Sequence, residues 1–326
     1  MRDPVRARPD GTPVGRSGAR RGFRDLPGRP CRDRPPLRAR RAGCRRPGRR
    51  GRRHTGGRRR AVDPGDPPGL TFADQQHVYG RRTPATLTSF RRLVAQTTPP
   101  PGRHLRVVAE LPSEMHARDW LEWQRYEAVL DHALAGCPVW FLCLQDTGRL
   151  PAQVVRWAHC THGHVLDDRG RRPNPGVQPP EHLLRQLPVP DEPLQATPPL
   201  LAADGVTRPG AVRHALVPLL SALDRSPDAT DDLLLAIDEL VTNALVHGRP
   251  PVDVRVWADG GTIVCTVVDG GRGPGDPFAG YGPAHGEDLS RGGMGLWLAR
   301  QLCDHVDIWT DERGVTVRVT TELPAR

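Results

Sequence analysis

The apolar positions of residues 205–326 follow two different periods along the chain. Residues 209–224 and 235–248 repeat apolar side chains every three or four positions, which predicts two amphipathic helices. "VDVRVW" (252–257) and "TIVCTVVD" (262–269) alternate instead, and the "ADGG" between them predicts a tight hairpin turn. "HVDIWT" and "GVTVRVT" alternate in the same way near the C-terminus. The order helix, helix, hairpin, loop, helix, hairpin predicts an α+β sandwich, an antiparallel or mixed sheet with helices on one face.

The helix that contains residues 235–248, for which Ser226 or Asp228 is the predicted N-cap, carries polar residues among others that are typical of a core. Glu239, Asn243 and His247 are spaced four apart, so they share one stripe of the helix. The side of the helix expected to be buried holds Leu235, Ile237, Leu240, Val241, Ala244 and Leu245. The polar stripe should therefore face a pocket or the solvent. His247, at the helix end, is expected to pack or cap rather than to react.

Residues 69–166 show a second pattern, in which nearly continuous apolar runs alternate with stretches of helical period. The apolar runs lie at 104–111 and 138–144, and the helical stretches at 114–135 and 151–159. The first helical stretch supplies apolar and aromatic core residues, namely Trp120, Trp123, Tyr126, Val129 and Leu130. Strand, helix, strand, helix predicts an α/β domain with a parallel sheet covered on both faces. The proline-rich residues 167–204 then predict a linker.

The net charge of +10 is concentrated at the N-terminus. Residues 1–60 hold 22 arginines and four aspartates, a local charge of +18 that leaves −8 on the rest of the chain. The chain contains no lysine. The arm formed by residues 1–68 has no strand or helix period and few large apolar residues, so we predict that it is disordered.

Three interpretations of this arm stay open. Its charge would suit a nucleic acid or an acidic partner, whereas its proline and glycine content disfavours the amphipathic helix of a targeting peptide. We favour the third, an upstream or frame-shifted start in a GC-rich gene, which would yield such a mixture of arginine, proline and glycine. Because the rest of the chain is mildly acidic, direct nucleic-acid binding is not expected.

The sequence argues against a membrane-spanning protein and against a disulfide-stabilised one. No apolar run reaches the roughly 18 to 20 residues of a membrane span, and no secretory signal follows the basic N-terminus, so we expect a cytoplasmic protein. The seven cysteines include no CxxC pair, which argues against a disulfide framework.

The cluster "HCTHGH" (159–164), with Cys143, contains zinc-binding residue types, but its spacing matches no zinc finger. A metal site is not expected there.

Two glycine-rich stretches separate the C-terminal elements. "VVDGGRG" ends a strand in Asp269, which places a carboxylate at the floor of a pocket, and Gly271 and Gly273 let the backbone approach a flat ligand. "RGGMGLWLARQL" opens a helix whose free N-terminal amides can hold phosphate. Each stretch alone could be an ordinary turn, but their occurrence in order with Glu239 and Asn243 favours one shared site.

These stretches resemble the N box and glycine boxes of the GHKL superfamily of ATP-binding domains, which have the Bergerat α/β sandwich fold. The resemblance implies that Asn243 ligands a Mg²⁺ ion at the ATP phosphates, and that Glu239 acts as the catalytic base or orients the nucleophile. It also implies that Asp269 accepts the adenine amino group, with Gly271 and Gly273 completing the first glycine box.

The resemblance further implies a flexible ATP lid at residues 274–291, closed by a second glycine box of Gly292, Gly293 and Gly295. Because the chain has no lysine, the cationic partner of the γ-phosphate must be an arginine or the metal, and Arg291 is the candidate by position. Phosphoryl transfer requires mainly that the reacting groups are positioned and that the charge on the phosphates is neutralised, and these residues would provide both.

Within the superfamily, "ELVTNALVHG" and "GGMGLWLARQLCD" are similar to the bacterial anti-sigma-factor Ser/Thr kinases. Such a kinase binds a sigma factor and phosphorylates a serine of an antagonist protein, so the resemblance implies these partners, control of transcription and a homodimer. A histidine kinase would need a dimerising helical hairpin where the proline-rich segment stands. Two alternatives stay open: a non-catalytic ATP-dependent binding switch, and a histidine-kinase-like sensor.

Residues 123–166 resemble the C-terminal half of the bacterial sensory domain MEDS. The matching residues are Tyr126, Glu127, Cys143, Asp146, Thr147, Thr161 and His162, with Gly163 where proline is usual. The N-terminal half of that family would fall on the arginine-rich arm, which favours the frame-shifted start and makes 69–166 a partial domain. A sensory domain joined to a kinase implies a signal-responsive regulator.

Overall fold

The computed structural model describes residues 82–97, 103–110, 117–282 and 293–325. The arm predicted over 1–68 lies outside the described residues, as do Arg291 and Gly292. Among the described residues, no helix is both long and apolar enough to cross a membrane.

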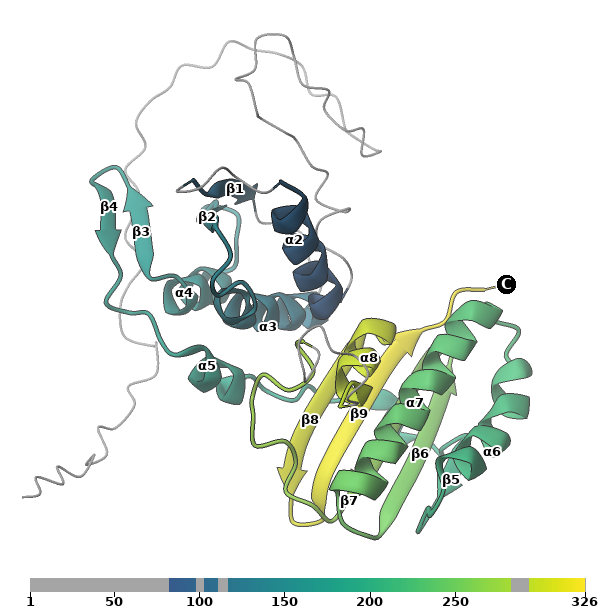
Figure 1. Cartoon of the computed structure of the whole chain (residues 1–326). Helices are drawn as coiled ribbons and strands as arrows, with labels where there is room; N and C mark the ends of the chain where they lie inside the picture. The colour runs from purple at the N-terminus through teal and green to yellow at the C-terminus, as the bar shows by residue number, and fades with distance from the viewer. Residues whose placement is uncertain (1–81, 98–102, 111–116, 283–292, 326) are drawn as a thin grey trace, which may run out of the picture. The chain divides into compact units, whose positions relative to one another are not determined.

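The C-terminal part is a five-stranded antiparallel sheet in the order β5-β6-β7-β9-β8. Its strands are β5 (Leu201–Ala203), β6 (Val252–Asp259), β7 (Thr262–Asp269), β8 (His305–Asp311) and β9 (Gly314–Glu322). The helices α6 (Pro209–Ser221), α7 (Pro227–His247) and α8 (Gly295–Leu302) lie on one face of the sheet (Figure 1). The predicted α+β sandwich is therefore confirmed.

Helix α7 packs its apolar side on the sheet and begins and ends where the sequence signals it. Ser226 is the N-cap residue, proline follows at the first helical position, and Gly248 is the C-cap residue. Its buried residues are Leu233, Leu234, Ala236, Ile237, Leu240, Val241 and Ala244. Burying a leucine or isoleucine contributes about 1.5–3 kcal/mol, so this face anchors the helix. Leu235 was expected on the buried side but is 39% exposed, because the buried stripe follows Leu234 and Ala236 instead.

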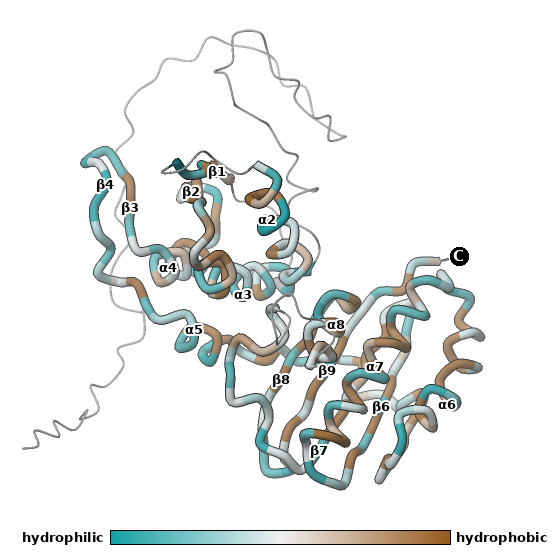
Figure 2. Tube along the Cα trace, in the orientation of Figure 1, coloured by the Kyte–Doolittle hydropathy of each residue, from teal (hydrophilic) through white to brown (hydrophobic). Residues whose placement is uncertain are grey.

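Hydropathy follows the same layering. Figure 2 shows long hydrophobic stretches along α6 and the neighbouring strands. Val254 and Val256 of β6 and Ile263 and Cys265 of β7 belong to one buried cluster with the helices. This cluster holds α7 at a fixed place over the sheet, and with it the polar stripe that the sequence singled out.

The part before it begins with α2 (Thr83–Thr97) and contains the strands β1 (Leu105–Glu110) and β2 (Val139–Leu144). The strands pair in parallel, and the helices α3 (Ala117–Ala133) and α4 (Ala152–Thr161) alternate with them, as predicted. The five core residues predicted on α3 are all buried.

The sheet β1-β2 differs from the prediction in its coverage. Val107 and Phe141 pack against the buried cluster, whereas Val108 and Trp140 are 61% and 40% exposed. Burial thus alternates along β1, and the described helices cover only one face of this sheet, whereas the sequence predicts cover on both.

The proline-rich residues 167–204 contain short elements that the pattern did not predict. The hairpin of β3 (His164–Asp167) and β4 (Gly170–Pro173) is followed by α5 (Pro180–Gln186) and the 3-10 helix η1 (Pro193–Ala196). Leu183 of α5 is buried with Ala128 and Cys160. Seven residues give too short a helical period to be seen among so many prolines.

Candidate functional site

Two of the polar residues of α7 meet the start of α8. A methyl group added at Gly295, the first residue of α8, would lie 2.6 Å from Asn243 Nδ2 and 2.8 Å from Glu239 Oε2. Helices α7 and α8 pack against each other on the sheet (Figure 1). Glu239 and Asn243 are half-buried, and neither side chain makes a hydrogen bond within the described part of the chain. Glu239 and Asn243 therefore face Gly295 of the second glycine box, and a larger residue there would have to displace the ends of these two side chains.

Asp269, the last residue of β7, is held by backbone amides. Its Oδ1 accepts hydrogen bonds from the amide nitrogens of Gly271 at 2.7 Å and Arg249 at 3.1 Å. The side chain is 8% exposed. A Cβ at Gly248 would overlap the Asp269 carboxyl group, so the end of α7 closes on this residue. These bonds occupy Oδ1 and leave Oδ2 for a ligand.

Gly248 was missed by the sequence analysis, although the signal was present as a glycine that follows the helix directly. Gly273 has a φ of +72°, a backbone conformation that favours glycine, and an added Cβ there would lie a tight 3.2 Å from Val315. Gly293 has a φ of +72° as well.

His247 is exposed at the end of α7 rather than packed.

The residues fit a Mg-ATP site by chemistry. Carboxylate and amide oxygens, as on Glu239 and Asn243, are the hard ligands that Mg²⁺ prefers. The N-cap residue of α8, Met294, makes no side-chain cap hydrogen bond. The first amides of α8 are thus not capped by that side chain, and helix N-termini of this kind suit phosphate.

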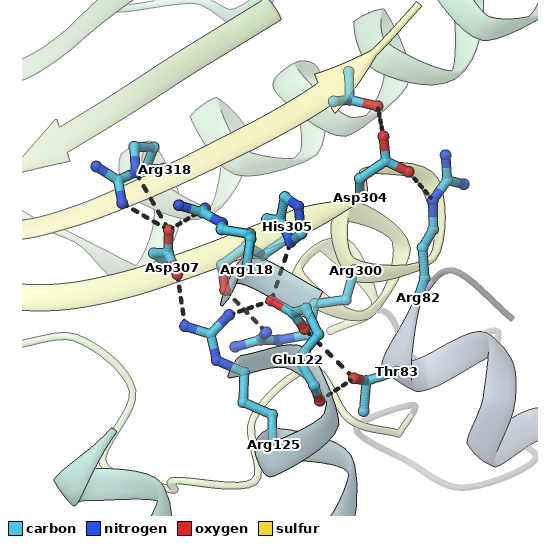
Figure 3. Close-up of polar contacts among 12 residues, drawn as sticks. Arg82, Thr83, Arg118, Glu122, Arg125, Arg300, Asp304, His305, Asp307 and Arg318 are labelled. Carbon is cyan, nitrogen blue, oxygen red and sulfur yellow. Dashed lines mark hydrogen bonds and ion pairs between the residues drawn. The ribbon is translucent and has the colours of Figure 1, made fainter. Parts of the chain in front are cut away.

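A second polar cluster, which the sequence did not suggest, surrounds Asp307 of β8 (Figure 3). Arg125 and Arg118 of the preceding part donate to its carboxylate at 2.6 and 2.8 Å, and Arg318 of β9 donates at 2.8 Å. Asp307 is fully buried. Burial alone would raise the pKa of Asp307, but the charges of Arg125 and Arg118 outweigh it and lower the pKa to about 2.

The five-stranded sheet with helices on one face is accompanied by a family match: the model of the histidine kinase-like ATPase domain matches residues 204–321. A second family model, MEDS (MEthanogen/methylotroph, DcmR Sensory domain), matches residues 58–163. Both resemblances found in the sequence are confirmed.

The serine-protein kinase RsbW of Bacillus licheniformis is 35% identical over 132 residues, which are 35% of this chain and 78% of that kinase. The anti-sigma F factor of Bacillus subtilis is 28% identical over 119 residues, 34% of this chain and 82% of that factor. The chain belongs to the family of histidine kinase-like ATPase domains that includes RsbW.

A crystal structure of the RsbU and RsbW domains of a Mycobacterium tuberculosis protein matches at 25% identity with a TM-score of 0.29. This match covers 40% of this chain and 34% of that one.

Proposed function

We propose that this protein binds Mg-ATP and acts as an anti-sigma factor and serine kinase that phosphorylates an antagonist protein. One observation carries the proposal: Glu239 and Asn243 converge on Gly295 at the start of α8. The similarity to RsbW and to the anti-sigma F factor, whose names state a serine-protein kinase and an anti-sigma factor, supports the choice of branch.

In this proposal each site residue has one role. Asn243 would hold Mg²⁺, which neutralises charge on the ATP phosphates. Asp269 Oδ2 accepts a hydrogen bond from the adenine amino group, with Gly271 and Gly273 allowing the base to approach. The amides at the start of α8, with Gly292, Gly293 and Arg291, hold the phosphates.

Glu239 is the proposed base. It takes the proton of the serine hydroxyl of the antagonist as the serine oxygen bonds to the γ-phosphorus. The bond from the γ-phosphorus to the bridging oxygen breaks, and ADP leaves. The placement of Glu239 one turn before Asn243 puts the base next to the metal ligand, where the attacking hydroxyl must approach.

A signal-responsive kinase is supported by contacts of the expected ATP lid. The Phe278 ring stacks on the His132 ring of α3, with ring centroids 3.8 Å apart and an angle of 5° between the planes. Tyr281 is buried in the aromatic cluster of the preceding part, and the Arg300 guanidinium of α8 lies 4.3 Å from its ring centroid. A shift of α3 would therefore be felt at Phe278 and Tyr281, so we propose that the sensory domain controls nucleotide access through these two residues.

The proposed partners are a sigma factor and its antagonist protein, in the cytoplasm where transcription takes place. We also propose that two copies of the chain form a homodimer through their ATP domains, as the resemblance to this family implies. The control of transcription is by partner exchange, without a direct contact to nucleic acid.

The function is tested by incubating the full chain with γ-labelled ATP, Mg²⁺ and candidate antagonist proteins encoded near the gene. We expect acid-stable phosphoserine on one antagonist, and its loss with Glu239→Gln. Acid-labile label would instead indicate phosphohistidine and a histidine-kinase-like sensor. ATP binding without transfer to any candidate, together with nucleotide-dependent binding of a partner, would indicate a non-catalytic switch.

A further inference from the structure

Three metal-binding side chains meet in the sensory part of the chain, outside the nucleotide site. Glu127 lies on α3, Cys143 on β2, and His162 at the end of α4. One ligand atom of each lies within 4.8 Å of the others. His162 Nε2 is 3.5 Å from Glu127 Oε2. The spacing 127, 143 and 162 matches no zinc finger, so the sequence analysis did not expect the site. The cluster weighed and set aside in the sequence, residues 159–164 with Cys143, already contained Cys143 and His162 but not Glu127, and its His159 and His164 are not part of this group.

The hydrogen bonds of His162 indicate which ring nitrogen faces the group. His162 Nδ1 lies 2.9 Å from the carbonyl oxygen of Ala158, which can only accept, and 2.9 Å from the hydroxyl of Thr161, which can accept as well as donate, so both contacts are compatible with a hydrogen on Nδ1. A neutral His162 then presents the lone pair of Nε2 to the carboxylate of Glu127. In that tautomer, the 3.5 Å between Nε2 and the Glu127 carboxylate leaves a place for a cation shared by the two, either a proton or a metal ion. A histidine that donates its other N–H to a backbone carbonyl is the usual arrangement of a metal ligand.

The separations suit a small tetrahedral ion. With metal–nitrogen and metal–oxygen distances of about 2.0–2.1 Å, tetrahedral geometry places two such ligand atoms about 3.4 Å apart. The observed distance between His162 Nε2 and Glu127 Oε2 is 3.5 Å. The two distances from Cys143 Sγ are at most 4.8 Å, so they have to contract by about 1 Å at most to reach the same geometry. Asp131, one turn further along α3, adds negative charge near Glu127 and Cys143.

The ligand set selects the class of ion. Thiolate, imidazole and carboxylate together suit a borderline ion such as Zn²⁺ rather than Mg²⁺ or Ca²⁺, which take oxygen ligands. Three protein ligands leave the fourth position of a tetrahedral ion to water or to an incoming molecule.

We propose that Glu127, Cys143 and His162 form a Zn²⁺ site with one open coordination position in the sensory part of the chain. An ion there would tie α3, β2 and α4 together. A signal molecule that takes the open position would change the packing of α3.

The test is a titration of the purified, metal-free full chain with Co²⁺, a spectroscopic substitute for Zn²⁺. We expect one ion per chain, an intense near-ultraviolet thiolate-to-cobalt absorption band, and displacement of the Co²⁺ by Zn²⁺. Cys143→Ser should abolish the band and weaken binding at least a hundredfold. Cys137→Ser, a matched change of a free and half-buried cysteine outside the group, should leave both unchanged.

His162→Gln and a protection assay keep the test decisive if Cys143→Ser unfolds. His162→Gln should weaken Co²⁺ binding at least tenfold, and Zn²⁺ should protect Cys143, but not Cys137, from alkylation followed by mass spectrometry. Absence of a thiolate band in the folded wild-type chain would overturn the proposal. A band that survives Cys143→Ser, or equal alkylation of Cys143 with and without Zn²⁺, would also overturn it. None of these readouts depends on ATP.

Discussion

Asp269→Asn separates the proposed adenine contact of Asp269 from its structural role. Asparagine keeps a side-chain oxygen that can still accept from the amides of Gly271 and Arg249. The Oδ2 position becomes an NH₂ group, which would face the adenine amino group, and two donors cannot bond. A hydrogen bond to a charged group contributes about 1.5–3 kcal/mol, and an unsatisfied buried donor costs about 1–3 kcal/mol more. The loss of about 3 kcal/mol or more corresponds to a roughly hundredfold or larger rise in the Kd for Mg-ATP.

Isothermal titration calorimetry measures this change, and thermal unfolding measures stability in parallel. Asp253→Asn is the matched control, because Asp253 also accepts a backbone amide, that of Gly205 at 2.9 Å, but lies outside the glycine boxes. We expect both variants to be folded and only Asp269→Asn to lose ATP affinity. Wild-type affinity in a folded Asp269→Asn variant would refute the assigned contact.

Three further predictions address the site and its support. Asn243→Ala should abolish Mg-ATP binding, whereas Glu239→Gln should bind Mg-ATP normally and lose phosphoryl transfer; equal loss of binding in both would contradict the separate roles. Gly248→Ala should lower ATP affinity at least tenfold and destabilise the fold by about 1–3 kcal/mol, because the added methyl overlaps the Asp269 carboxyl; calorimetry and urea unfolding measure the two effects. Asp307→Asn should lower the free energy of unfolding by roughly 3 kcal/mol, since it leaves buried guanidinium groups unpaired. The pKa of Asp307 is lowered to about 2, so its stabilisation is complete above its ordinary value of 3.8 and is lost as the pH falls toward 2. Unfolding curves between pH 2 and 6 should show this loss in the wild type and a smaller one in the variant.

The C-terminal fold could be predicted because its signals are local. The alternation in β6 and β7, the turn between them and the helical period of α7 each lie within a short window. The order of the elements then leaves few ways to cover one face of a sheet. The order of the motifs and the family resemblance predicted that Glu239, Asn243 and the glycine stretches share one site, but not that Gly295 is the residue that faces both side chains, because the helices are far apart in sequence.

Other features depend on long-range contacts that no local pattern carries. Arg125 meets Asp307 across 182 residues, and neither has a sequence neighbourhood that distinguishes it from a solvated charge. The sequence pointed to Cys143 and His162 as metal-binding residue types, but it did not place Glu127 with them. Cys143 lies on a strand, whereas Glu127 lies on one helix and His162 at the end of another, and no local pattern brings the three together. Helix α5 was hidden by the prolines around it.

The most direct test of the proposed function is the binding of ATP to the full chain with and without Mg²⁺, compared between the wild type and Asn243→Ala. We predict Mg²⁺-dependent binding in the micromolar range that the substitution abolishes without unfolding the protein. No binding by the folded wild type, or equal binding with and without Mg²⁺ in both proteins, would contradict the kinase mechanism proposed for this chain.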